Sequence, residues 1–316
     1  MIARSIASRV LQAIPVFLAI SVLVFFISHL GGDDPITNAL AGILPQDAID
    51  AIRREYGLDQ PVYVQYLLWL KHLFSGDWGL SLTLRVPVFD VLGTAFFNTL
   101  ILTVGAVLIC LLAGVSVGVL AGLKRGSAVD GVTMLVIQLG HNLPVFWSGL
   151  VLIWLFAVRL DWLPASGMYD MRGDQTFGDL LAHLVLPAFS AAIVSMLILA
   201  QLVRASVIEI IGSDYIRTYR SQGFARSTIL RRHLGRNLLS PVVNITGLQI
   251  GYLLSGVIFV ENVFAWPGIG THLYNAAAGK DYPMTQAGVM LITGCFLVVN
   301  LVTDVILDLL NPRLRA

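Results

Sequence analysis

Long runs of apolar residues recur along the 316-residue chain, separated by more polar segments. A helix rises 1.5 Å per residue, so about 20 apolar residues are needed to cross the roughly 30 Å hydrocarbon core of a bilayer. Six runs reach that length: residues 10–30, 98–122, 132–158, 184–203, 241–260 and 285–307. The pattern predicts an all-α polytopic membrane protein with six transmembrane helices.

The first and third runs need separate comment. Arg4 and Arg9 precede the first run, as in a secretory signal, but the run is too long for one and no A-x-A site follows, so we expect a retained span. The third run contains Gln138, Asn142 and Pro144, which are compatible with one kinked helix or a helix with a break. One helix is the simpler count.

Basic residues are unevenly divided between the segments that flank these runs. With six spans both termini share one side, and that side holds most of the 20 Lys and Arg residues: Arg4, Arg9, Lys124, Arg125, Arg204, Arg217, Arg220, Arg226, Arg231, Arg232, Arg236, Arg313 and Arg315. The positive-inside rule therefore predicts that both termini are cytoplasmic.

The segment between the first two runs, residues 31–97, is long enough to hold structure of its own on the outer side. We expect a helix over 46–56 and a second over 62–74, which is too short to span and carries Tyr63, Tyr66 and Trp69 for the outer membrane interface. This divides the chain into residues 1–97, the first span with its outer loop, and 98–316, a five-helix core.

Composition agrees with a membrane protein and excludes other classes. Hydrophobic residues make up 57% of the chain and charged residues only 12%, about half of what a soluble domain carries, and the net charge of +1 gives no basic field for nucleic acid. Cys110 and Cys295 lie inside apolar runs, where packing is the expected role. The chain has no P-loop, no H-E-x-x-H, no Cys/His cluster with metal spacing and no G-x-S-x-G, so we expect no catalytic, cofactor-binding or metal-binding residue.

The inner segment 204–240 is the most informative part of the sequence. Ser213 or Asp214 can cap a helix over 215–222, Gly223 supplies a positive-φ stop, and Ser227 can cap a helix over 228–237. Such a compact projection suits docking onto a soluble partner. The alternative is that its arginines only set the topology and touch anionic lipid headgroups.

Residues 214–223, DYIRTYRSQG, resemble the E-A-A-x-x-x-G loop of ABC importer permeases, in the D-Y-x-R-T-A-R-A-x-G form of the dipeptide, oligopeptide and nickel branch. In that family the short helix inserts into a groove on the cytoplasmic ATPase. The resemblance implies an ATPase-coupling role for the segment 213–223, carried by Asp214, Tyr215, Arg217, Thr218, Tyr219 and Gly223. Tyr219 departs from the pattern, because a small alanine is usual at its position.

Further segments match the same branch in the same order: 56–61, 65–66, 76–81, 163–167, 261–270, 281–283 and 311–313. The resemblance implies a type I ABC importer permease of the bacterial inner membrane that forms half of a translocation pathway for dipeptides, oligopeptides or a related small solute. The implied partners are a second homologous permease, two cytoplasmic ATPase subunits that bind ATP and Mg²⁺, and an external substrate-binding protein.

Polar residues inside the spans are candidates for the translocation path, because hydrocarbon penalises them unless they face protein or water. The candidates are Gln138, Asn142, Asn244, Gln249 and Asn300. Each could instead form a hydrogen bond between helices. Glu261 and Trp266 are placed at the outer mouth, although a plain solvated carboxylate is an equal alternative for Glu261. Small residues at four-residue spacing indicate close helix packing: Gly114, Gly118 and Gly122, then Gly247, Gly251 and Ser255.

Two other functions remain as alternatives. One is a secondary, ion-coupled transporter or a channel-like protein. Either would carry charged residues near the middle of the membrane, and a secondary transporter would also have two related halves. The sequence has no evident repeat and almost no such charge. A membrane-embedded enzyme would need paired acids, an activated nucleophile or metal ligands at matched depth, and none is apparent.

Overall fold

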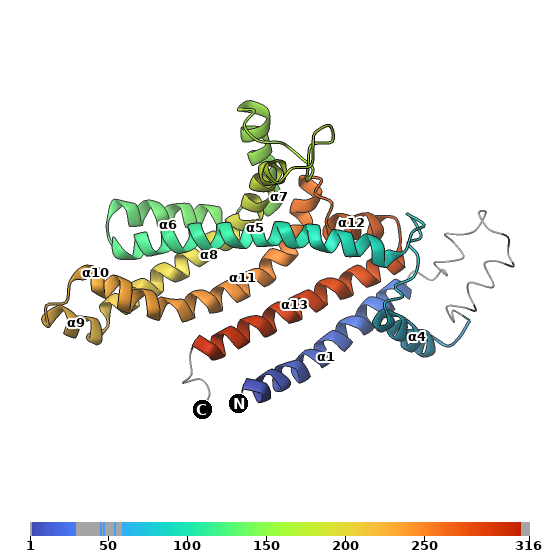
Figure 1. Cartoon of the computed structure of the whole chain (residues 1–316), viewed down its shortest axis with the longest axis horizontal. Helices are drawn as coiled ribbons and strands as arrows, with labels where there is room; N and C mark the ends of the chain where they lie inside the picture. The colour runs from blue at the N-terminus through green and yellow to red at the C-terminus, as the bar shows by residue number, and fades with distance from the viewer. Residues whose placement is uncertain (1, 30–44, 46, 48–53, 55–58, 311–316) are drawn as a thin grey trace. The chain divides into compact units, whose positions relative to one another are not determined.

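The computed structural model describes residues 2–29, 45, 47, 54 and 59–310. These residues form helices without any extended sheet, and the one bridge in the described part joins Leu80 to Pro87. The all-α prediction is confirmed (Figure 1). The helices are α1 (Ile2–His29), α4 (Val62–Ser75), α5 (Val88–Leu123), α6 (Ala128–Gly140), α7 (Val145–Leu152), the π-helix η1 (Ile153–Arg159), α8 (Phe177–Gly212), α9 (Asp214–Ser221), α10 (Arg226–Thr228), the π-helix η2 (Ile229–Leu234), α11 (Gly235–Val263), α12 (Ile269–Ala278) and α13 (Tyr282–Leu310).

Each of the six apolar runs falls on one long helix or on a bent pair of helices. Four single helices are long and apolar enough to cross a membrane, namely Ile6–Ser28, Val88–Leu123, Phe177–Gly212 and Tyr282–Leu309. Two further candidates are bent pairs, which bring the number to six if each pair is one span. Helices α5 and α8 have 36 residues each, so their length of about 54 Å exceeds the hydrocarbon thickness.

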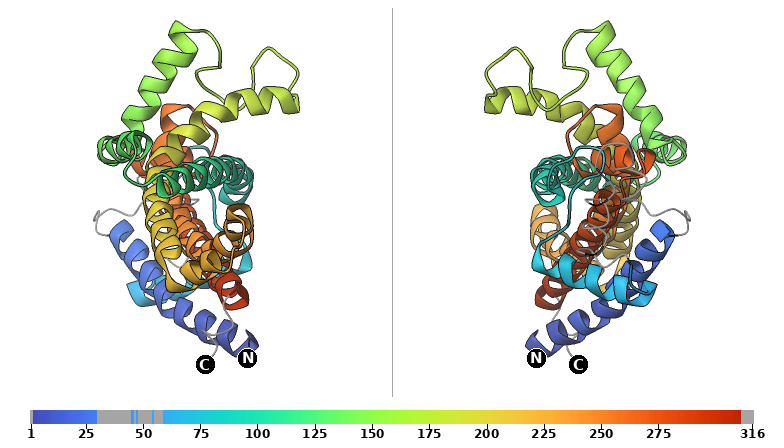
Figure 2. Two further views of the ribbon diagram at one scale, coloured as in Figure 1. Left: turned by 90° about the vertical axis from the view of Figure 1, so that its left-hand side faces the viewer. Right: turned by 90° about the vertical axis from the view of Figure 1, so that its right-hand side faces the viewer.

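The third run is broken, so of the two alternatives the helix with a break is the one observed, and the simpler count of one helix was wrong. Helices α6 and α7–η1 meet at 109° around residues 141–144. Pro144 has extended backbone angles of φ −61° and ψ 132°, and it cannot donate the amide hydrogen that a continuous helix would need. Figure 2 shows α7 and η1, in light green, leading away from α6.

The fifth run is also bent. The pair Gly235–Leu253 and Gly256–Val263 meets at 51° within α11. Pro241 lies inside the first of these segments.

The chain forms two compact units that are discontinuous in sequence. One comprises Met1–Ile6, Leu100–Trp266 and Val298–Ala316, and the other comprises Ala7–Thr99 and Pro267–Leu297. Helices α5 and α13 contribute residues to both units. The division at residue 97 that the sequence suggested stays a prediction.

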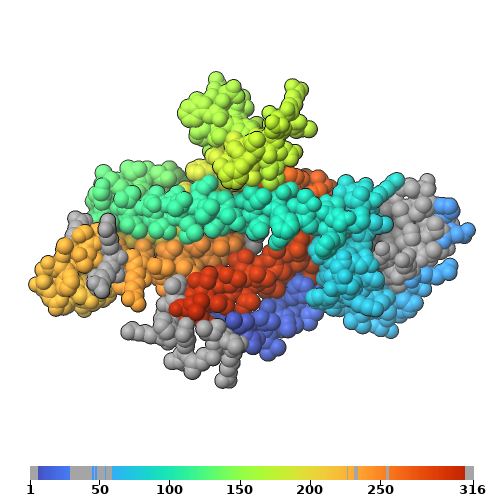
Figure 3. Space-filling view, in the orientation of Figure 1, coloured from blue at the N-terminus to red at the C-terminus, as the bar shows by residue number. Residues whose placement is uncertain are grey.

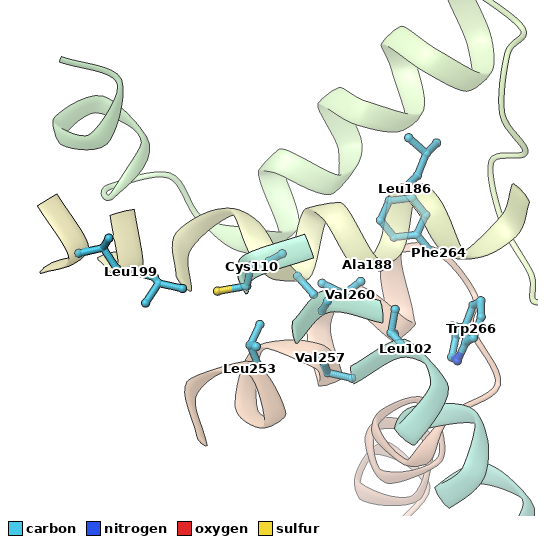
Figure 4. Close-up of a cluster of buried hydrophobic side chains, with 14 of the residues drawn as sticks. Leu102, Cys110, Leu186, Ala188, Leu199, Leu253, Val257, Val260, Phe264 and Trp266 are labelled. Carbon is cyan, nitrogen blue, oxygen red and sulfur yellow. The ribbon is translucent and has the colours of Figure 1, made fainter. Parts of the chain in front are cut away.

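Helices α5, α8 and α11 build the core of the larger unit. Figure 4 shows a cluster of buried side chains from these helices and the loop after α11, including Leu102, Cys110, Ala188, Leu199, Leu253, Val257, Val260, Phe264 and Trp266. The predicted packing role of Cys110 is confirmed by its place in this cluster.

The first stripe of small residues brings α5 against α8. A Cβ atom on Gly114 would lie 2.9 Å from the carbonyl oxygen of Met196, and one on Gly118 would lie 2.6 Å from that of Ala200. On Gly122 it would meet Val207 at 2.8 Å. The two backbones are too close for any side chain, so the predicted packing role is confirmed. In the second stripe, Gly247 of α11 packs directly on Thr303 of α13.

The smaller unit packs the start of α5 against α12 and the start of α13. The apolar cluster at this contact comprises Val88, Leu92, Ala95, Ile269, Leu273, Ala276, Met284 and Ala287. The predicted helix 62–74 is confirmed as α4, whose Tyr66 and Trp69 rings each lie 5.5 Å from the ring of Phe25 in α1. The predicted helix 46–56 falls almost wholly outside the described residues.

Candidate coupling surface

A short hairpin joins α8 to α11 and contains α9. Helix α8 ends at Gly212, Ser213 takes an extended conformation, and α9 follows over Asp214–Ser221. The Ser213 hydroxyl donates to the carbonyl of Ile210 and makes no cap hydrogen bond, so capping by Ser213 is not seen. Asp214 lies in the first turn of α9, where the helix dipole favours a negative charge.

Gly223 ends α9 as predicted, with φ +81°. Its amide donates to the carbonyl of Arg220 over 3.1 Å, and the Phe224 amide donates to the carbonyl of Tyr219 over 3.1 Å. This pair of bonds is the Schellman arrangement, which usually includes an apolar contact across the turn. Here the rings of Tyr219 and Phe224 supply it, with centroids 5.3 Å apart.

The two faces of α9 differ in exposure. Ile216 is fully buried and Tyr219 half-buried, whereas Asp214, Tyr215, Arg217, Thr218 and Arg220 are exposed. The Tyr215 hydroxyl accepts a hydrogen bond from Asn237 of α11 over 2.9 Å, which fastens α9 to the second long helix. Arg217 lies 3.6 Å from Asp214, an exposed pair of little energetic weight.

The second half of the segment 204–240 differs from the prediction. A separate helix over 228–237 capped by Ser227 was wrong: α10, η2 and α11 follow one another from Arg226 without a break, with helical backbone angles at Thr228, Leu234 and Gly235. Residues 204–212 likewise belong to α8. The hairpin is therefore a short helix carried between two long ones, and it is visible in gold in Figure 3.

Comparison with known proteins identifies the family to which the chain belongs. The model of the family "Binding-protein-dependent transport system inner membrane component" matches residues 114–316, and that of the N-terminal part of such membrane components matches residues 2–112. The chain belongs to this family. It is a permease subunit of an ABC importer.

Curated relatives match the permease over nearly its whole length. It is 37% identical to the di/tripeptide transport system permease protein DppB of Pseudomonas aeruginosa (strain UCBPP-PA14), with 98% of each chain covered. The dipeptide permease DppB and the glutathione permease GsiC of Escherichia coli (strain K12) are 35% and 34% identical, again with 98% of each chain covered.

A solved structure supports the fold. A chain of the MetNI methionine ABC transporter, in inward-facing conformations, superposes with a TM-score of 0.57 at 18% identity, covering 70% of the permease and 96% of that chain. The fold is that of a type I ABC importer permease.

The candidate pathway residues of the permease lie on α11 and α13 and at the end of α6. Gln138 and Asn142 are both exposed, and the Asn142 side chain donates to the carbonyl of Gln138 over 3.1 Å, across the end of α6. On α11 Asn244 is exposed, whereas Gln249 is buried and its Oε1 has no hydrogen-bond partner among the residues that the structure describes. Asn300 of α13 is partly exposed. A pathway role stays a prediction for all five.

The two residues expected at the outer mouth have buried side chains, and their place at an outer mouth stays a prediction. Glu261 and Trp266 are both fully buried, and the Trp266 amide donates to the carbonyl of Glu261 over 2.8 Å. The amide of Gly167 donates to the carbonyl of Phe264 in the same segment, also over 2.8 Å. A plain solvated carboxylate therefore does not describe Glu261 in this chain.

The structure also shows two buried carboxylates to which no individual role was assigned from the sequence. Asp130 at the start of α6 pairs with Arg204 of α8. Asp281, before α13, accepts hydrogen bonds from Ser81, from the amide and hydroxyl of Thr83 and from the amide of Met284. For Asp130 the sequence did contain a signal. It lies three residues after Ser127, at the start of an apolar helix, where a carboxylate is favoured by the helix N-terminus.

Proposed function

We propose that this permease imports short peptides or a chemically similar small solute, and that α9 is its contact with a cytoplasmic ATPase. Its relatives named above are permeases for di- and tripeptides, dipeptides and glutathione. Glutathione is itself a small peptide-like molecule with free amino and carboxylate groups, so these substrates share one chemistry. The import path would be formed with a second permease, and an external binding protein would deliver the solute.

The proposed permease subunit does no chemistry of its own. Two ATPase subunits would bind ATP and Mg²⁺. The basic residues of the hairpin favour a cytoplasmic side for α9 and both termini in a bacterial inner membrane.

The observation that carries the proposal is the division of α9 into two faces. The inward face, with Ile216 and Tyr219, holds α9 in place, while Arg217 and Thr218 project into solvent and bond no other element in the described structure apart from the weak pair with Asp214 within α9 itself. A docking helix needs this combination of a fixed backbone and exposed side chains. Because α9 lies between α8 and α11, a push on it acts on two helices of the core.

The proposal is tested by reversing the charge at Arg217, whose side chain is 73% exposed. Arg217→Glu should lower ATP-dependent uptake and co-purification of the ATPase about 10-fold, because docking is lost while the inward face is untouched. Arg172→Glu makes the same charge change at an exposed position outside the hairpin and should leave both unchanged. Full ATPase binding and uptake by the Arg217→Glu protein would contradict the assignment.

The substrate class is tested separately with the complete importer. Dipeptides and glutathione should compete with one another for ATP-dependent uptake, and single amino acids should not. Competition by neither peptide would contradict the substrate class and leave the role of α9 standing.

A further inference from the structure

Helix α6 is fastened to α8 by a charged pair close to the hairpin. The Arg204 guanidinium donates through Nε to one oxygen of Asp130 and through Nη2 to the other oxygen over 2.8 Å. Asp130 is 5% exposed and also accepts the amide of Gly126 over 2.9 Å. A two-pronged contact of this kind fixes both distance and orientation, which a single bond does not.

Apolar contacts continue the attachment along the two helices. Ile137 of α6 is buried against Leu197 and Ala200 of α8, and Gly140 packs directly on the Leu197 side chain. Residue numbers rise along α6 as they fall along α8, so the helices are antiparallel and joined from Asp130 to Gly140. Apolar side chains resist separation of the helices but tolerate sliding, so the charged pair is the contact that fixes their register.

The position of the paired helices α6 and α8 between two other features indicates what the Asp130–Arg204 contact could do. Arg204 is followed by eight helical residues of α8 and then by Ser213 and α9, so displacement of α9 reaches Arg204 through the last two turns of α8. At the other end of α6 lie Gln138 and Asn142 and the 109° bend. The pair therefore sits between the hairpin and the break in the third span.

We propose that Asp130 and Arg204 are positioning residues that make α6 move together with α9, so that ATPase motion reaches the break at residues 141–144. This rests on the proposed coupling role of α9. Without the Asp130–Arg204 contact, α9 would still dock and the ATPases would still hydrolyse ATP. However, α8 would slide along α6, and the movement of α9 would not reach the break at residues 141–144. The pair thus controls how much solute is moved for each ATP hydrolysed.

The test uses the complete importer in proteoliposomes, with uptake and ATP hydrolysis measured on the same sample. Arg204→Lys keeps the charge and removes the two-pronged contact, and Asp130→Asn keeps the shape and removes the charge. Both should retain ATPase binding and lower uptake per ATP about 10-fold. The exchange Asp130→Arg with Arg204→Asp should recover part of the loss.

A distance measurement separates coupled movement from general destabilisation. Labels on Cys at the exposed positions Leu135 of α6 and Ala225, just after the turn that ends α9, lie outside the proposed docking face. They should keep one separation with and without nucleotide in the parent protein, and should change separation on nucleotide binding in Arg204→Lys. Unchanged uptake per ATP together with an unchanged separation in Arg204→Lys and Asp130→Asn would overturn the inference. Loss of ATPase binding in Arg217→Glu but not in these variants keeps the two proposals apart.

Discussion

Tyr219 illustrates how one side chain can shape the hairpin from within. Its bulk is unusual for the family pattern, in which a small alanine is usual at this position. In the structure the ring turns toward Phe224 and lies against it across the Gly223 turn, half-buried. The tyrosine therefore stabilises the end of α9, and its neighbours Arg217 and Thr218 form the exposed face.

A side chain at Gly223 should strain the backbone, because its φ of +81° is a left-handed conformation. Open space surrounds it, so Gly223→Ala adds backbone strain of about 1–2 kcal/mol and no clash. Gly76 has the same φ within one degree and the same open surroundings at the end of α4. We expect Gly223→Ala to lower ATP-dependent uptake and Gly76→Ala to leave it intact, at equal amounts of inserted protein. Equal uptake by the two variants would contradict the prediction.

Asp281 should be a major stabilising residue of the smaller unit. It is fully buried, and its carboxylate accepts hydrogen bonds from residues 81 and 83, some 200 positions earlier in the chain. Asp281→Ala would leave these donors unpaired and should cost about 3 kcal/mol. Thermal unfolding of the purified permease measures this, with exposed Asp59→Ala as the matched control. A melting temperature equal to that of the control would show that the bonds are replaced by water.

At the scale of elements, features set by local patterns could be predicted and those set by distant contacts could not. The helix over 62–74, the stop at Gly223 and the packing stripe on α5 follow from spacing or backbone freedom within one segment. The direction of the chain after Pro144 and the continuity of η2 with α11 depend on what packs beside them. Asp130 meets Arg204 across 74 positions, and no local pattern identifies that partner.

The close approach of α5 and α8 gives a prediction at this scale. Gly118→Ala places a Cβ 2.6 Å from the backbone oxygen of Ala200, so the helices must separate at a cost of about 1–3 kcal/mol. Gly93 lies on the same helix with nothing within 4 Å, and Gly93→Ala should be neutral or slightly stabilising. Thermal unfolding in detergent compares the two, and equal stability would mean that α5 and α8 are not in contact at this point.

At the scale of the whole molecule, hydropathy indicated a membrane protein and the ordered motifs indicated the family. Both are confirmed by the family match over residues 2–112 and 114–316 and by the long apolar helices. The burial of Glu261 and Trp266 could not be predicted, since a carboxylate at the end of an apolar run reads as solvated until the segment around Phe264 is seen to fold inward. The family does not favour the ion-coupled alternative.

The central claim is that this permease moves solute only when an ATPase acts on α9. Uptake of a labelled dipeptide into proteoliposomes tests it most directly, comparing the complete importer with the permease pair alone, each with ATP and with a proton gradient. Uptake should require the ATPases, ATP on the side that carries α9 and the binding protein on the other side. Uptake by the permease pair alone, driven by the gradient without ATP, would contradict the claim.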